Sequence, residues 1–108
     1  MTVRELVSAM DLKIVCMPDG DREVTGGYAG DLLSWVMGRA ETGVAWVTIM
    51  SNVNIVAVAT LADPACIVLS EGVNPDDGVV EKAMTVGVNI LSSTENTFSV
   101  CSKISKLI

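Results

Sequence analysis

Residues 44–70, VAWVTIMSNVNIVAVATLADPACIVLS, decide the fold class that we expect for this chain. Val44–Met50 and Ala65–Ser70 are compact apolar runs with the length of buried strands. The stretch Asn52–Ala62 fits either a strand or a helix, because periodicity cannot decide a segment with so few polar residues. We predict a helix there, because two parallel strands need a crossover connection between them.

The residues before this unit predict a helix, a strand and a second helix. Thr2–Glu5 has the spacing of a capping box, and the apolar residues that follow recur on one helical face. Leu12–Met17 is β-prone and ends in the turn Pro18–Gly20. Asp31 is positioned to cap a helix that runs to Arg39.

The residues after this unit continue the alternation. Asn74 as N-cap, with Pro75 after it, predicts a helix that ends at Gly87, and Val88–Leu91 predicts a short strand. Thr94 can cap a last helix, in which four residues share one face: Phe98, Cys101, Ile104 and Ile108. We therefore expect residues 1–108 to form a single three-layer α/β domain, with a mainly parallel sheet flanked by helices.

Composition narrows the functional classes. The formal net charge of −6 over 108 residues would repel polyanions, so we expect neither nucleic-acid nor membrane binding. The three cysteines lie far apart and the chain has no histidine, which excludes a structural zinc site and fits reduced thiols in a cytoplasmic protein. The apolar stretch Ile55–Leu69 is too short to span a membrane, and Arg4 argues against a secretory leader.

No catalytic arrangement is visible in the sequence. Without histidine, neither a Ser-His-Asp nor a Cys-His arrangement can form. The phosphate-binding loop of kinases is absent as well, because none of the four lysines follows a glycine. We therefore predict that the chain is not an enzyme and carries no cofactor.

Three glycines stand close together in the segment DREVTGGYAGD, residues 21–31. Gly26, Gly27 and Gly30 fit a plain tight turn or a phosphate-binding turn, and we expect a positive φ at Gly26 or Gly27. We expect Asp21 and Arg22 to be structural. Arg22 would pair with a carboxylate or with carbonyls that hold the glycine turn, because a guanidinium makes several directed bonds at once.

Polar residues follow the predicted strands at the edge where open parallel sheets bind ligands. These are Ser51 and Asn52, either of which could instead cap the helix that follows, and Ser92, Ser93 and Thr94. Free N–H groups at helix N-termini there could hold an anion or a sugar; the alternative is ordinary helix capping. The candidate ligand-binding set joins these residues to those of the glycine segment: Thr25, Gly26, Gly27, Gly30 and Asp31.

The pattern Asp21-Arg22-x-Val24-Thr25-Gly26-Gly27-Tyr28-x-Gly30-Asp31-Leu32-Leu33-Ser34 resembles the DRTGG domain family. Two later blocks, Asn54–Ala59 and Asn89–Ser93, extend the resemblance over essentially the whole chain. The resemblance implies an α/β domain similar to the N-terminal domain of HPr kinase/phosphorylase. Domains of this family also occur beside CBS pairs in regulated pyrophosphatases. In such settings the domain is regulatory or dimer-forming, and the resemblance supplies no catalytic residues.

Two functions therefore remain in competition. The first is a non-catalytic regulatory or ligand-sensing module, a homodimer that binds an adenine nucleotide or another small anionic metabolite near Thr25–Asp31 and Ser92–Thr94. The second is an adaptor that binds a protein partner and has no small-molecule ligand. A ligand that raises the melting temperature would favour the first, because binding to the native state alone stabilises it.

Overall fold

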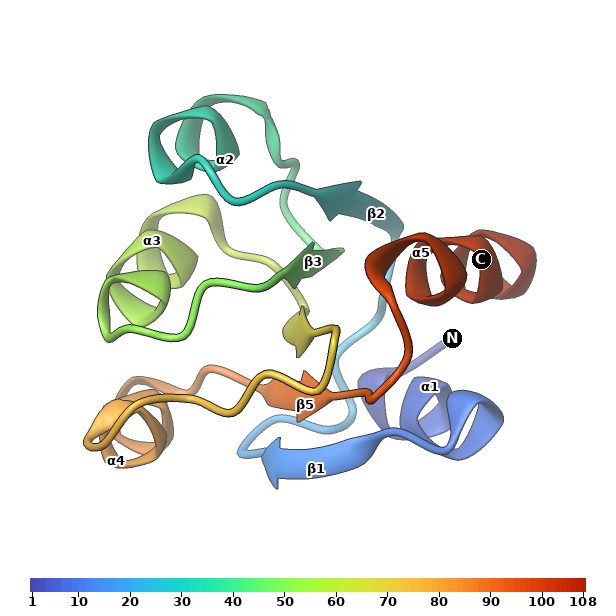
Figure 1. The fold of residues 1–108 in the computed structure, drawn as a ribbon, viewed down its shortest axis with the longest axis horizontal. Helices are drawn as coiled ribbons and strands as arrows, with labels where there is room; N and C mark the ends of the chain where they lie inside the picture. The colour runs from blue at the N-terminus through green and yellow to red at the C-terminus, as the bar shows by residue number, and fades with distance from the viewer.

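A computed structural model describes residues 1–108 and shows a five-stranded sheet between two layers of helices (Figure 1). Its elements are α1 (Val3–Met10), β1 (Lys13–Cys16), β2 (Gly26–Ala29), α2 (Leu33–Arg39), β3 (Val44–Thr48), α3 (Asn54–Ala62), β4 (Cys66–Leu69), α4 (Val79–Val86), β5 (Ile90–Ser92) and α5 (Thr97–Leu107). The strands lie in the order β1-β5-β4-β3-β2. All neighbours are parallel except β1, which runs antiparallel to β5. The predicted α/β class is confirmed.

Each face of the sheet is covered by its own apolar core. On one face α1 and α5 pack over the sheet, and on the other α2, α3 and α4 do so (Figure 1). The first core joins Leu6 of α1 and Ile104 of α5 to inward residues of the central strands. The second is centred on Trp46, which is fully buried and donates its indole N–H to the Gly30 carbonyl at 2.9 Å. A three-layer arrangement follows from these two cores.

The helix predicted over Asn52–Ala62 is confirmed as α3. Asn52 accepts the backbone N–H of Asn54 at 2.9 Å and so satisfies a donor near the start of the helix. The helix is apolar on most sides because it packs against the sheet, α2 and α4 together. Asp63, the C-cap residue that follows the helix, adopts a left-handed conformation with φ of 57°, which turns the chain toward β4.

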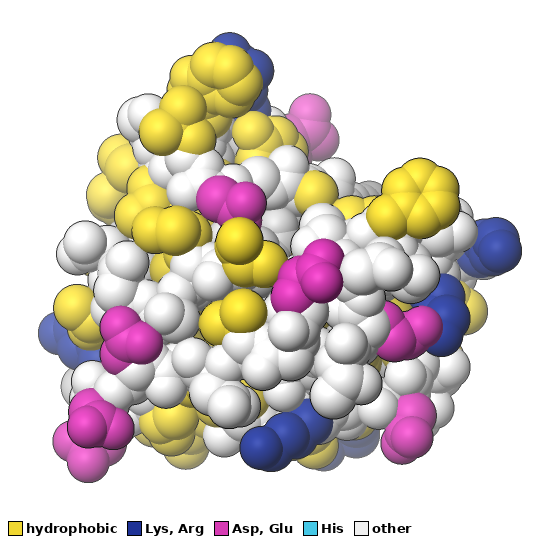
Figure 2. Space-filling view, viewed as in Figure 1, with side chains coloured by type: hydrophobic (Ala, Val, Ile, Leu, Met, Phe, Trp, Pro, Cys, Tyr) yellow, Lys and Arg dark blue, Asp and Glu magenta, His cyan; other side chains and the backbone are white.

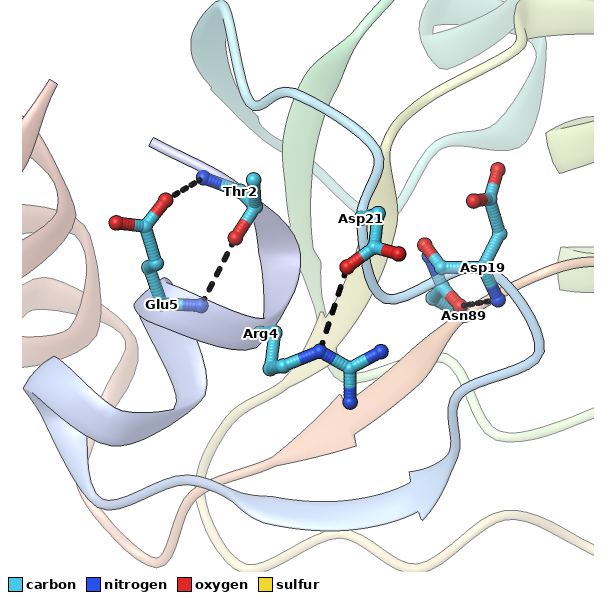
Figure 3. Close-up of polar contacts among 6 residues, drawn as sticks. All are labelled: Thr2, Arg4, Glu5, Asp19, Asp21 and Asn89. Carbon is cyan, nitrogen blue, oxygen red and sulfur yellow. Dashed lines mark hydrogen bonds and ion pairs between the residues drawn. The ribbon is translucent and has the colours of Figure 1, made fainter.

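Side-chain hydrogen bonds fasten the N-terminal region (Figure 3). Thr2 and Glu5 form the predicted capping box, in which each side chain accepts the backbone N–H of the other. Asn89, which is buried, accepts the N–H of Asp19 and donates to the carbonyls of Asp19 and Ala65. Asn89 thus joins the loop after β1 to the starts of β4 and β5.

Two helices begin later than the sequence predicts. The helix expected from Asn74 and Pro75 begins instead at Val79, because the Asp76 N–H bonds to the Ser51 carbonyl and Gly78 has a φ of 85° that interrupts helical geometry. Thr94 does not cap the last helix. Its N-cap is Asn96, whose side chain accepts the N–H of Ser99 at 2.9 Å.

The face predicted for the last helix is also only partly correct. Val100 and Ile104 are its buried residues, whereas Phe98 is 84% exposed. Cys101 is partly covered and Ile108 remains exposed. None of the helices has both the length and the apolar character needed to cross a membrane.

Candidate functional site

A polar hollow lies beyond the carboxyl end of β5. Its volume is about 540 Å³, and its lining includes the predicted residues Ser92, Ser93 and Thr94. Lys13 of β1 lines it too, because the antiparallel pairing of β1 with β5 places Lys13 opposite Ser92. We call it the β5 hollow. The residues that line it are Met10, Asp11, Lys13, Gly72, Val73, Asn74, Ser92, Ser93, Thr94, Glu95 and Lys103.

The two cations of the β5 hollow differ in their partners. Lys103 pairs with the Glu95 carboxylate through contacts of 2.6 and 2.8 Å, so its charge is largely balanced. Lys13 makes no ion pair. The carboxylate of Asp11 also borders the hollow, which is therefore mixed in charge rather than strongly basic. Such a site suits a small ligand with one or two acidic groups better than a polyanion.

The helix N-terminus beside the β5 hollow is already capped. Glu71 accepts the N–H of Thr97 at 2.8 Å, and Asn96 accepts the N–H of Ser99. Ser93 stabilises the preceding turn by accepting the N–H of Glu95 at 3.1 Å. Because the chain itself satisfies these donors, the expectation of free N–H groups for an anion is not met at α5. The hydroxyls of Ser92 and Thr94 make no hydrogen bond within the chain, which leaves them available.

The glycine segment is a strand rather than the predicted turn. Gly26 and Gly27 lie in β2, paired with Val44 and Ala45 of β3. Neither has a positive φ, so that prediction is wrong; the glycine beside β2 that does have one is Gly43, at 86°, just before β3. The sequence did not indicate this strand, because Gly26–Ala29 lacks the run of alternating apolar residues that predicts a strand.

Arg22 contacts a carboxylate and a carbonyl, both belonging to Asp63. Its guanidinium donates to the Asp63 carboxylate at 2.7 Å and to the Asp63 carbonyl at 3.0 Å. The hydrogen bond from Arg22 lowers the pKa of Asp63 below its ordinary value. The pair fastens the segment before β2 to the end of α3 instead of holding a glycine turn. Asp21 forms only an exposed contact with Arg4 at 3.4 Å (Figure 3).

Asp31 joins two strands and does not cap α2. One of its carboxylate oxygens accepts the hydroxyl of Thr48 at 2.7 Å and the N–H of Ile49 at 3.0 Å. The N-cap position of α2 is Leu32, which makes no side-chain cap. Asp31 and Gly30 border a second hollow of about 460 Å³, together with Tyr28, Ala29, Leu32, Trp35 and Arg39. We call it the α2 hollow.

The predicted ligand-binding residues do not converge on one site. Thr25, Gly26 and Gly27 line a third hollow at the amino end of β2, whereas Ser92, Ser93 and Thr94 line the β5 hollow. Two strands, β3 and β4, lie between β2 and β5. Ser51 and Asn52 lie outside these hollows, and their polar groups bond to Asp76 and Asn54. The sequence did not indicate Lys13 as a site residue, because only the antiparallel placement of β1 brings it beside Ser92. It did not indicate Lys103 either, because that residue joins the hollow only through the packing of α5 and its pairing with Glu95.

The cysteines are poor nucleophiles in this fold. Burial raises the pKa of the Cys66 thiol to about 12, and it also raises the pKa of Cys16 and of Cys101. The reactive thiolate is therefore suppressed at neutral pH. No three residues among Cys, Asp and Glu gather to form a metal site.

The structure describes an α/β domain with ligand-sized hollows at the ends of its strands. Residues 5–107 match the DRTGG domain, so the chain belongs to the DRTGG domain family, as the sequence resemblance indicated. A solved structure of similar fold is that of the CBS and DRTGG domains of the regulatory region of Clostridium perfringens pyrophosphatase, complexed with the activator diadenosine tetraphosphate. The TM-score is 0.72 at 10% identity, over 95% of this chain and 45% of that one.

This chain thus spans less than half of the pyrophosphatase regulatory region that it resembles. A comparison with curated proteins gave no match. The likeness therefore concerns the fold of one domain.

Proposed function

We propose that this chain is a non-catalytic, ligand-sensing regulatory domain that forms a homodimer and binds a small anionic metabolite in the β5 hollow. Family membership supports a regulatory role, and the similar pyrophosphatase region was crystallised with a nucleotide activator. The chain has no histidine to act as a base, and burial raises the pKa values of its thiols, which makes them poor nucleophiles.

The observation that carries this proposal is the unpaired ammonium of Lys13 beside two unpaired hydroxyls. Lys13 lies opposite Ser92 at the end of the sheet, and Thr94 borders the same hollow. An ammonium with neighbouring hydroxyls can hold a phosphate or carboxylate through charge-assisted hydrogen bonds. The ligand class that fits is a small monoanion or dianion that also carries hydroxyls, such as a nucleoside monophosphate.

A thermal-shift experiment with AMP, ATP, acetyl phosphate and coenzyme A as probes tests the proposal. A ligand at one hundred times its dissociation constant stabilises the native state by about 2.7 kcal/mol. We expect Lys13→Gln to weaken binding about tenfold or more. Lys106→Gln is the matched control, because Lys106 is exposed on α5 and lies outside the hollow.

Each result distinguishes the competing functions. A shift that both variants retain places the ligand elsewhere and contradicts the β5 hollow. If no probe shifts the melting temperature, the adaptor function becomes the better account. Exposed apolar side chains favour that second candidate, and Figure 2 shows such side chains gathered over α2 and α3. The exposed large apolar residues there are Trp35 and Met37 of α2 and Leu61 of α3, with Leu32 just before α2.

A further inference from the structure

Four charged side chains line the β5 hollow, and their formal charges cancel. Lys13 and Lys103 supply the positive charges, and Asp11 and Glu95 supply the negative ones. One pair is joined: both carboxylate oxygens of Glu95 accept hydrogen bonds from the Lys103 ammonium, at 2.6 and 2.8 Å. Lys13 and Asp11 form no ion pair. Lys13 is therefore the cation of the hollow that an anionic ligand can bind without displacing a carboxylate.

Backbone hydrogen bonds, rather than the carboxylate, fix Glu95 in its loop. Its carbonyl accepts the N–H of Glu71 at 2.7 Å, and its own N–H donates to the Ser93 hydroxyl at 3.1 Å. The side chains of Glu95 and Lys103 are 36% and 50% exposed, and an ion pair with this exposure adds little to stability. The loop therefore keeps its shape without the Glu95 carboxylate, whose hydrogen bonds go to Lys103 alone.

We infer that Glu95 determines how many acidic groups a ligand of the β5 hollow can carry. The inference rests on the anion site proposed above and narrows its ligand class to molecules with one phosphate or carboxylate group. While Glu95 holds Lys103, Lys13 can bind one acidic group, and further acidic groups meet the Glu95 carboxylate. Like charges in contact are costly, so Glu95 selects against diphosphates and triphosphates.

Asp11 provides a matched control, because its carboxylate borders the same hollow but neutralises no lysine. Glu95→Gln and Asp11→Asn each remove one negative charge from the hollow, and only Glu95→Gln releases an ammonium. Asp11 has a left-handed backbone, with a φ of 52°. Asparagine tolerates that conformation better than most residues, so Asp11→Asn should fold. A difference between the two variants therefore reports on Lys103 and not on net charge.

Isothermal titration calorimetry with AMP and ATP, without divalent metal ions, tests the inference. The two probes share the base and the ribose and differ in their number of phosphates. We expect the unmodified chain to bind AMP at least as tightly as ATP. Glu95→Gln should tighten ATP binding about tenfold or more and AMP binding by less, because ATP carries further acidic groups for the released Lys103. Asp11→Asn should tighten the binding of both probes to the same small degree.

The outcomes separate this inference from the proposed function. An equal change of the ATP-to-AMP affinity ratio in both variants would overturn the role of Glu95 and leave the anion site standing. An unmodified chain that binds ATP more tightly than AMP would do the same. If neither the unmodified chain nor a variant binds either probe, both proposals fail. Binding of ATP by Glu95→Gln alone would support exclusion by Glu95 and overturn the proposed function of the unmodified chain.

Should Glu95→Gln misfold, Lys103→Gln decides. This variant leaves the Glu95 carboxylate unpaired beside the hollow, so AMP binding must weaken. An unchanged AMP affinity in Lys103→Gln contradicts the inference.

Discussion

The two edges of the sheet differ in how they meet solvent. β1 carries Lys13, and its pairing with β5 is irregular between Ile14 and Cys16. Both features discourage another strand from pairing with that edge. β2 has neither feature, and three of its four residues, Gly26, Gly27 and Ala29, have little or no side chain. The contrast teaches that this fold protects the β1 edge within the chain and gives the β2 edge neither of these protections.

The largest change in stability that we predict concerns Asn89, on the side of the sheet near β1. Asn89→Ala removes the side chain that bonds to both backbone groups of Asp19 and to the carbonyl of Ala65, which is buried. Unpaired buried groups are costly, so we expect a loss of about 3 kcal/mol in the free energy of unfolding, measured by urea denaturation. Asn74→Ala, at an exposed asparagine, should cost less than about 0.5 kcal/mol. Equal losses would mean that Asn89 does not hold the β1 side.

A smaller effect separates two glycines near β2. Gly43 has a φ of 86°, and a Cβ there would lie 2.6 Å from Oγ1 of Thr25, so we expect Gly43→Ala to cost about 2 kcal/mol. Gly27 has no such constraint, and Gly27→Ala should change stability by less than about 0.5 kcal/mol. Denaturation of both variants at one protein concentration gives the comparison. An equal loss of unfolding free energy in both variants would contradict the conclusion that the positive φ lies at Gly43 and not at Gly27.

The smallest effect concerns the ion pair that fastens the segment before β2. Arg22→Lys keeps the charge but loses the guanidinium, which donates at once to the carboxylate and to the backbone carbonyl of Asp63. We expect the free energy of unfolding to fall by about 1 kcal/mol or less, because the pair is partly exposed. The pKa of Asp63 is lowered in the folded state. Its stabilisation is therefore complete above the ordinary value of 3.8 and is lost as the pH falls through the lower folded-state pKa.

Asp63→Asn isolates this pH dependence. The difference in unfolding free energy between the unmodified chain and this variant should be constant near neutral pH and shrink below about pH 4. Subtraction of the variant removes the acid response of the other carboxyl groups. A difference that stays constant down to about pH 2 would show that Asp63 does not titrate with the pair.

The sequence predicted the parts of the fold that depend on apolar runs. β3, α3 and β4 were expected from residues 44–70 because two continuous apolar strands require a crossover. The spacing of Thr2 and Glu5 alone predicted the capping box of α1. Such features depend on residues close together in the chain, where a few positions determine local geometry.

The features that the sequence did not reveal depend on contacts between distant residues. β2 consists of Gly26–Ala29, whose composition is typical of a turn, and only pairing with β3 makes it a strand. The start of α4 is delayed by a bond between Asp76 and Ser51, which lie far apart in sequence. The β5 hollow obtains Lys13 through the pairing of β1 with β5. No local pattern carries such information.

The position of β1 also determines the order in which the domain can fold. Strands β2 to β5 join neighbours in the chain through short crossovers, so they can assemble with modest loop-closure entropy. β1, by contrast, pairs with β5, and Lys13 must find Ser92 near the opposite end of the chain. Long-range pairing of this kind is slow. During synthesis β1 leaves the ribosome before the other strands and cannot pair until β5 has followed, so we expect the β5 hollow with Lys13 to be completed after the rest of the sheet.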